Sequence, residues 1–84
     1  MNALIEKILI INRYKFDDLD QIWIKYSPNY IHKVILYEDY MDMIQMYCYR
    51  KDDIEKVRFY DTGIIKFTAI ELMTYIKTMV MNLE

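Results

Sequence analysis

The chain has few of the residues that form tight turns or disulfide bonds in small proteins: it has one glycine, one proline and one cysteine in 84 residues. No linker or low-complexity tract appears, so residues 1–84 are predicted to form a single domain. The lone Cys48 cannot form an internal disulfide, which is the usual staple of small secreted domains. We therefore expect a cytoplasmic protein that is kept in its reduced state.

Long hydrophobic runs and an excess of charge are also missing. No apolar run approaches the roughly 18 residues that cross a bilayer, and the first residues lack the pattern of a secretion signal. The formal net charge is -2, with an isoelectric point near 5.3. Because lysine and arginine supply most of the affinity for duplex DNA, this balance argues against duplex DNA as a partner. We expect no membrane contact.

Motifs for catalysis and metal binding are absent from the sequence as well. His32 is the only histidine, and there is no glycine-rich phosphate loop or serine elbow. His32 and Cys48 are predicted to lie side by side, but in the core, where a cysteine is inert. Two such ligands cannot hold a structural zinc ion. We expect a protein that is not an enzyme and carries no cofactor or metal.

The chain is rich in apolar residues, at 55%, and in aromatic residues, at 15%, which favours a dense core. Leu4, Ile5, Ile8, Leu9 and Asn12 follow helical spacing, with the polar pair Glu6 and Lys7 opposite them. This pattern predicts an N-terminal helix. The alternative is a strand over Lys7–Asn12, because residues 8–11 form a short apolar run.

Alternation at period two predicts the strands that follow. They are expected at Gln21–Tyr26, Tyr30–Tyr37, Met43–Tyr49 and Lys56–Tyr60, with a short segment at Ile64–Lys66. Helical spacing of Phe16, Leu19, Trp23 and Tyr26 leaves a helix as the alternative for the first strand. Turns are predicted at residues 27–29 and 61–63.

The last element has the clearest local signals. Thr68 and Glu71 form a capping-box pattern, and Phe67 is placed to contact Leu72. One apolar face follows, made of Ala69, Leu72, Met73, Ile76, Met79, Val80 and Leu83. The chain is thus predicted to be an α+β two-layer sandwich. An antiparallel meander of about four strands carries the N-terminal and C-terminal helices on one face.

The predicted register divides the sheet into two faces. A turn centred on Pro28 places Ile24 opposite His32, and a loop centred on Tyr40 places His32 opposite Cys48. The core face is then predicted to hold Ile22, Ile24, His32, Val34, Leu36, Ile44, Met46 and Cys48. The outer face is predicted to bind a partner through Trp23, Lys25, Ile35, Tyr37, Tyr47 and Tyr49. A slip of one residue would exchange the faces of a strand.

Three interpretations of this aromatic face remain open. Tryptophan, tyrosine and arginine supply most anchors of protein interfaces, which favours a protein partner or a homodimer through the sheet face or an edge. Aromatic residues also prefer strands for their own sake. Stacking of single-stranded nucleic acid is the third interpretation, although the glycine–aromatic motif of RNA-binding sheets is missing.

The meander also predicts an acidic end, where several loops meet. Its residues are Asp17, Asp18, Asp20, Glu38, Asp39, Asp42 and Asp61. Such an acidic patch can occupy the basic groove of another protein, whereas a calcium loop motif is missing. Aspartate is equally ordinary in turns, because it bonds to its own backbone there.

These patterns together favour a small interaction module. Compact proteins without motifs are often accessory proteins of phages and mobile elements, which bind and inhibit a larger host protein. By this analogy we expect a protein partner, with single-stranded nucleic-acid binding as the alternative function.

Overall fold

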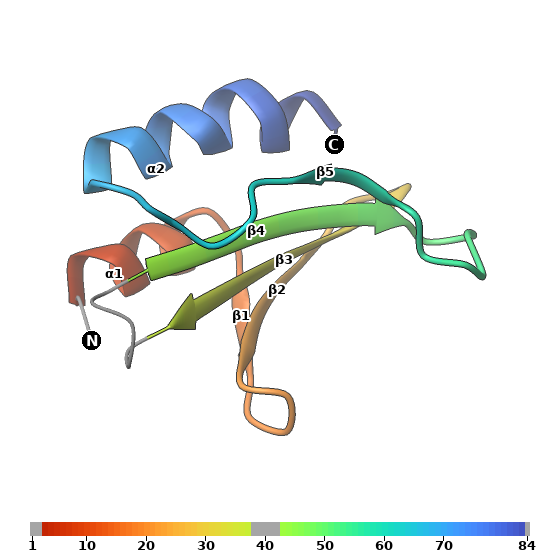
Figure 1. Ribbon diagram of the computed structural model, residues 1–84, viewed down its shortest axis with the longest axis horizontal. Coiled ribbons are helices and arrows are strands. Elements are labelled where there is room, and N and C mark those ends of the chain that lie inside the picture. The colour runs from red at the N-terminus through yellow and green to blue at the C-terminus, as the bar shows by residue number, and fades with distance from the viewer. Residues whose placement is uncertain (1–2, 38–42, 84) are drawn as a thin grey trace.

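The computed structural model describes residues 3–37 and 43–83. Its element order confirms an α+β fold, with helices at both ends of an antiparallel sheet (Figure 1). The elements are α1 (Ala3–Ile11), β1 (Lys15–Asp17), β2 (Ile22–Tyr26), β3 (Tyr30–Tyr37), β4 (Met43–Arg50), β5 (Arg58–Asp61), β6 (Ile65–Lys66), α2 (Ala69–Tyr75), the π-helical η2 (Ile76–Val80) and the 3-10 helix η3 (Met81–Leu83).

The sheet is a meander in the order β1-β2-β3-β4-β5, with β6 pairing with β4. It therefore has slightly more strands than the four expected. β6 falls within the predicted segment Ile64–Lys66, but β1 was not predicted. Its three residues, Lys15–Asp17, are too few to display an alternation.

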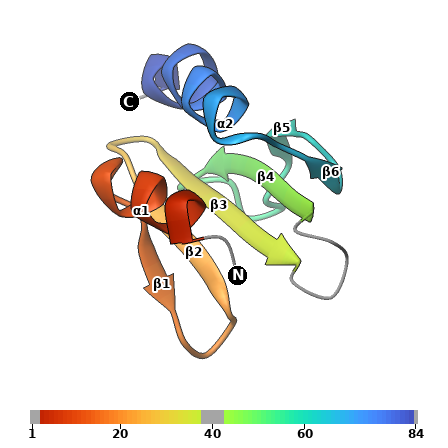
Figure 2. The same ribbon diagram turned by 90° about the vertical axis from the view of Figure 1, so that its left-hand side faces the viewer.

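The helices α1 and α2 lie on the same side of the sheet (Figure 2). The core forms between these layers, where Leu9 of α1 and Leu72 of α2 are fully buried, as are Val34 and Met46 of the sheet. This confirms the two-layer arrangement. Each such side chain stabilises the fold by roughly 1.5–3 kcal/mol.

Helix α1 ends without a glycine. Asn12 donates through its backbone N–H and its side-chain Nδ2 to the carbonyl of Ile8, at 3.1 and 2.8 Å. Arg13 then takes the left-handed conformation with φ 70°, and Tyr14 N–H donates to the Leu9 carbonyl. This closes the free carbonyls of the last turn in the way that a glycine at this position normally permits.

Helix α2 begins at the predicted capping box. Glu71 N–H donates to Thr68 Oγ1 at 3.2 Å, and Thr68 N–H donates to Glu71 Oε1 at 3.1 Å. The continuous apolar face predicted beyond it is partly wrong, because Met79 is 39% exposed. The helix becomes π-helical at Ile76–Val80, and this wider turn rotates Met79 toward solvent while Val80 stays buried.

The register between β3 and β4 confirms the prediction, with His32 opposite Cys48 and Val34 opposite Met46. The core-face residues His32, Val34, Leu36, Ile44, Met46 and Cys48 accordingly lie on or against the core.

The predicted register between β2 and β3 is wrong by one residue. Trp23 lies opposite Val34 and Lys25 opposite His32. The reason is the turn: Ser27 N–H donates to the Tyr30 carbonyl, so the loop is centred between residues 28 and 29 and not on Pro28. The side chains of β2 therefore exchange faces. Trp23 and Lys25, at 7% and 6% exposure, lie on the helix side.

Candidate interaction surface on the open face of the sheet

The face of the sheet turned away from α1 and α2 is called the outer face here (Figure 2). Within residues 3–37 and 43–83, no helix lies against it. Its central residues are Ile22, Ile24, Tyr26, Ile31, Lys33, Ile35, Tyr37, Gln45, Tyr47 and Tyr49. Lys15 and Asp17 flank it on β1, and Arg58 and Asp61 flank it on β5.

Four of the predicted partner-binding residues lie on this face, namely Ile35, Tyr37, Tyr47 and Tyr49. Trp23 and Lys25 do not: Trp23 packs in the core against Phe16, with ring centroids 5.2 Å apart. Ile22, Ile24 and Tyr26 replace them on the outer face. A turn centred between Pro28 and Asn29 sets the register that places these three residues on the outer face. Assigning that turn from the sequence would have identified them.

Cationic side chains lie over the tyrosine rings of the outer face. Lys33 Nζ and Lys56 Nζ lie 5.2 and 5.9 Å from the centroid of the Tyr49 ring. The Arg58 guanidinium lies 4.0 Å from the centroid of Tyr47. Each such pair contributes about 0.5–1 kcal/mol at an exposed site. Tyr49 is thereby buried and serves to position two ammonium groups.

The charge of Lys33 is supported by its neighbours. Partial burial by itself lowers the pKa of Lys33, but the hydrogen bond and electrostatic attraction of Tyr49 outweigh it, with contributions from Tyr47 and Asp20. The net effect raises the pKa above its ordinary value. Lys33 therefore presents a fixed positive charge at the centre of the outer face.

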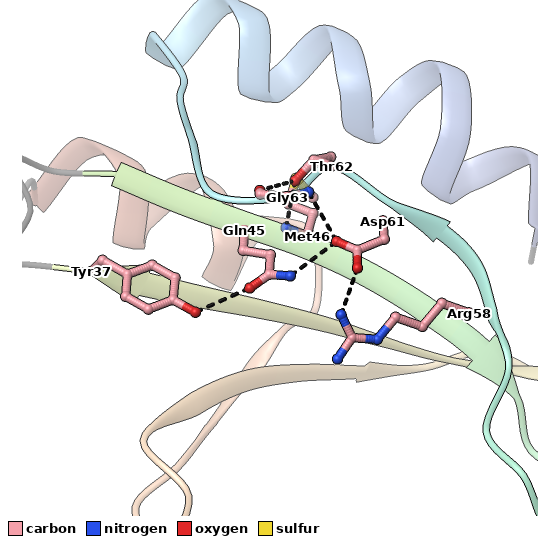
Figure 3. Close-up of polar contacts among 7 residues, drawn as sticks. All are labelled: Tyr37, Gln45, Met46, Arg58, Asp61, Thr62 and Gly63. Atoms are coloured by element: carbon pink, nitrogen blue, oxygen red, sulfur yellow. Dashed lines mark hydrogen bonds and ion pairs between the residues drawn. The ribbon is translucent and has the colours of Figure 1, made fainter.

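A chain of hydrogen bonds crosses the outer face from β3 to β5 (Figure 3). Tyr37 Oη donates to Gln45 Oε1 at 3.0 Å, and Gln45 Nε2 donates to Asp61 Oδ1 at 3.0 Å. Asp61 also accepts from the Gly63 N–H and from Arg58 Nη1. This chain fixes the rotamers of polar side chains on a surface that solvent reaches.

The same contacts tune the carboxyl group of Asp61. The hydrogen bonds from Gln45 and the Gly63 N–H, followed by the bond and charge of Arg58, lower the pKa of Asp61, although burial opposes them. Arg58 is itself aligned over Tyr47, so Asp61 holds this guanidinium in place.

We expect Asp61→Asn to lower the free energy of unfolding at neutral pH by up to about 1 kcal/mol, the range of a partly exposed ion pair. Because the folded pKa lies below the unfolded value of about 3.9, the stabilisation is complete above the unfolded pKa and is lost as pH falls through the folded pKa. Urea titrations from pH 7 to pH 2 measure this convergence. A stability gap that persists at pH 2 would contradict it.

The acidic residues are only partly brought together. Asp17, Asp18 and Asp20 lie at the β1–β2 turn, where Asp17 Oδ1 accepts from the Leu19 N–H at 3.0 Å, as expected of a turn aspartate. Asp61 lies on β5, at the opposite edge of the sheet from β1. Glu38, Asp39 and Asp42 lie outside the described residues. The structure therefore separates Asp61 from the acidic turn.

His32 and Cys48 are fully buried neighbours on β3 and β4. Burial raises the pKa of the Cys48 thiol to about 11, which keeps it protonated at neutral pH. His32 Nε2 lies 3.3 Å from Ser27 Oγ, and His32 Nδ1 lies 3.0 Å from Tyr60 Oη. Burial raises the pKa of Tyr60 as well, so its hydroxyl keeps the proton.

The acceptors around Ser27 are the basis for assigning the protons of this buried cluster. Ser27 Oγ lies 3.3 Å from the Tyr30 carbonyl and 3.2 Å from the Leu83 carbonyl, so we assign its proton to a carbonyl and the proton between Ser27 and His32 to His32 Nε2. Tyr60 Oη then donates to His32 Nδ1. The cluster joins β3, β5, the β2–β3 turn and the C-terminal turn of the helix layer, so its role is to hold these elements in register.

Metal and membrane features were searched over the same described residues. No three histidine, cysteine, aspartate or glutamate side chains of residues 3–37 and 43–83 converge on a possible metal position. No helix in these ranges has the length and apolar character needed to cross a membrane.

The fold and the outer face define the class: a small α+β protein whose antiparallel sheet is covered by helices on one side only. Comparisons with models of protein families, with curated proteins and with solved structures found no significant match.

Proposed function

We propose that this protein is a non-enzymatic interaction module that binds a protein partner through the outer face. The observation that carries the proposal is the composition of that face. No described helix covers it, yet its centre is isoleucine and tyrosine, with Lys33, Lys56 and Arg58 stacked on tyrosine rings. Tyrosine and arginine are enriched at the anchor points of protein interfaces.

The geometry resembles an interface with its own centre and rim. Ile24 and Ile35, both half-buried, lie on the adjacent strands β2 and β3 and supply apolar surface, whereas Ile22 beside them is buried. Gln45 and Asp61 border them with satisfied hydrogen bonds. A partner would bury the apolar centre and meet side chains whose rotamers are already fixed, which lowers the entropic cost of binding.

Single-stranded nucleic acid is the second candidate, because Lys33, Lys51, Lys56 and Arg58 all lie over tyrosine rings. Base stacking, however, needs a free ring face. Tyr49 is 6% exposed, and Arg58 lies on the Tyr47 ring. Tyr26 is exposed, but the Lys51 ammonium lies over its ring. Each of these three rings is therefore buried or already covered by a cation, which favours the protein partner.

The test is photo-crosslinking in cells that produce the protein. A benzophenone amino acid replaces Tyr47 on the outer face or, as the control, Ile10 on the exposed side of α1. We expect a discrete protein adduct from position 47 and none from position 10. Adding Ile35→Asp is expected to reduce the adduct at least tenfold, whereas Ile10→Asp is expected to leave it unchanged.

Three outcomes would reject the protein partner. One is the absence of any adduct from position 47, and another is equal adducts from positions 47 and 10. The third is an adduct that nuclease removes, which would establish nucleic acid as the ligand. Far-ultraviolet circular dichroism of each variant confirms that the fold is retained.

A further inference from the structure

Three lysine side chains over the outer face, called the lysine cluster here, are Lys33, Lys51 and Lys56. Lys33 Nζ and Lys56 Nζ lie over the ring of Tyr49, at 5.2 and 5.9 Å from its centroid. Lys51 Nζ lies 5.7 Å from the centroid of the Tyr26 ring. In the part of the chain that the structure describes, no carboxylate lies within ion-pair distance of these three ammonium groups.

The two tyrosine rings set the spacing of the cluster. Tyr26 lies opposite Ile31, which in turn lies opposite Tyr49, so the three residues form one row across β2, β3 and β4. Neighbouring strands are about 4.8 Å apart, which places Tyr26 and Tyr49 about 10 Å from each other. The row thus presents positive charge at two points, with Lys51 over one end and Lys33 and Lys56 over the other.

The aspartates that follow β4 in the sequence bond to other groups. Asp52 pairs with Arg50, and Asp53 accepts from the backbone N–H groups of Glu55 and Val57, at 3.0 and 3.1 Å. The loop that carries Lys51 and Lys56 therefore satisfies its aspartates through local bonds and leaves its lysines to the outer face.

Two further carboxylates act on the outer face. Asp61 is bonded to Arg58 and neutralises that guanidinium. Asp20 attracts Lys33 electrostatically but forms no ion pair with it. The positive charge of the cluster thus remains available to a partner, although the protein as a whole has a formal net charge of -2.

Apolar side chains adjoin the cluster. Ile24 lies directly opposite Lys33, and Ile35 follows it two residues along β3 on the same face. Both isoleucines are half-buried. A ligand that covers this area must therefore supply apolar contacts beside its negative charges, which a nucleic-acid backbone does not provide.

We propose that the outer face recognises an acidic segment of its partner protein, whose aspartate and glutamate side chains pair with the lysine cluster. Apolar residues of the same segment would cover Ile24 and Ile35. This inference rests on the proposed function and adds the chemistry of the partner. Face-to-face pairing of two copies would bring two lysine clusters together, whereas an acidic segment is complementary to the cluster.

The test measures the photo-crosslinked adduct from position 47, where the substitution leaves Tyr26 and Tyr49 in place. We expect Lys33→Glu/Lys56→Glu to reduce the adduct at least tenfold. Lys7→Glu/Lys77→Glu makes the same change of charge at exposed positions of the helix layer and is expected to leave the adduct unchanged. Mass spectrometry of the adduct is expected to find a cross-linked peptide in which acidic residues outnumber lysine and arginine.

A second pair of measurements separates loss of attraction from repulsion or unfolding. Lys33→Gln/Lys56→Gln removes both charges without adding carboxylates, and we expect it to reduce the adduct less than the glutamate variant does. A synthetic peptide with the cross-linked sequence is then titrated with the full chain by fluorescence anisotropy. Its version with asparagine and glutamine in place of the acids is expected to bind at least tenfold more weakly. Circular dichroism confirms that each variant is folded.

The failures of the two proposals differ. An adduct that Lys33→Glu/Lys56→Glu leaves unchanged, or a cross-linked peptide without an excess of acidic residues, overturns the acidic segment but leaves the protein partner standing. Loss of the adduct in Lys7→Glu/Lys77→Glu would show that net charge and not the cluster is responsible. An adduct of two copies of the 10.4 kDa chain would identify a second copy as the occupant. The absence of any adduct from position 47 rejects both proposals.

Discussion

Trp23→Ala is expected to lower the free energy of unfolding by about 3–5 kcal/mol, the range for removing a large aromatic side chain from a core. Trp23 is 7% exposed and belongs to the same cluster as Leu9, Val34 and Met46. Small domains have about 5–15 kcal/mol in total, so this variant should lose a large share of its stability and unfold at a much lower urea concentration. Urea denaturation followed by circular dichroism measures the loss.

Ile24→Ala is the matched control, because Ile24 is the next residue of the same strand and points to the outer face. We expect it to cost less than about 1.5 kcal/mol, since only part of its side chain is buried. The comparison tests the register of β2 directly. With the register predicted from the sequence the order would be reversed, with Ile24 in the core and Trp23 dispensable for folding.

His32→Leu is expected to cost about 2–4 kcal/mol, although leucine fills much of the same volume. The buried Tyr60 hydroxyl loses its acceptor at His32 Nδ1, and the Ser27 hydroxyl loses its donor at His32 Nε2. A buried polar group that loses its partner costs about 1–3 kcal/mol. Urea denaturation at neutral pH again gives the measurement.

A double-mutant cycle shows whether the cost comes from this cluster. Tyr60→Phe removes the hydroxyl itself and is expected to cost about 1–3 kcal/mol. In the double variant His32→Leu/Tyr60→Phe there is no hydroxyl left to satisfy, so the combined loss is expected to fall at least about 1 kcal/mol short of the sum. Strictly additive losses would show that the two side chains do not stabilise one another.

Local signals in the sequence were sufficient for most of the fold. The capping box at Thr68 and Glu71 located the start of α2, and period-two alternation located the long strands β3 and β4 with the register that pairs His32 with Cys48. These elements are long or carry reciprocal side-chain contacts, so several residues specify each one. The three residues of β1 carry no such redundancy, because pairing with β2 defines that strand.

The outer face was harder to predict, because one backbone hydrogen bond determines which residues of β2 lie on it. Alternation along β2 favours Ile22, Ile24 and Tyr26 for the core over Trp23 and Lys25, yet the register set by the Ser27–Tyr30 turn bond places Trp23 and Lys25 on the helix side. The cations over Tyr47 and Tyr49 come from residues 33, 56 and 58, which no local pattern connects. Tertiary contacts of this kind need the folded chain.

Helix α1 shows another limit of sequence patterns. Seven of the nine residues in α1 are apolar, Glu6 and Lys7 being the other two, so the pattern does not reveal how much of each side is covered. Leu4 was expected on the buried stripe but is 55% exposed. The position of α2, which the α1 sequence does not encode, determines which apolar residues stay open to solvent.

Because glycine is scarce, other residues occupy turn positions that require a left-handed backbone. Arg13, Gln21 and Lys56 adopt left-handed backbone angles, with φ of 70, 58 and 55°, at a cost of about 1–2 kcal/mol each. Glycine at residues 13 and 21 would relieve that cost and is a direct route to a more heat-resistant protein. Lys56 is different, because its ammonium group lies over Tyr49 on the outer face. Thermal tolerance and surface chemistry thus make opposite demands at residue 56, and the natural chain favours surface chemistry.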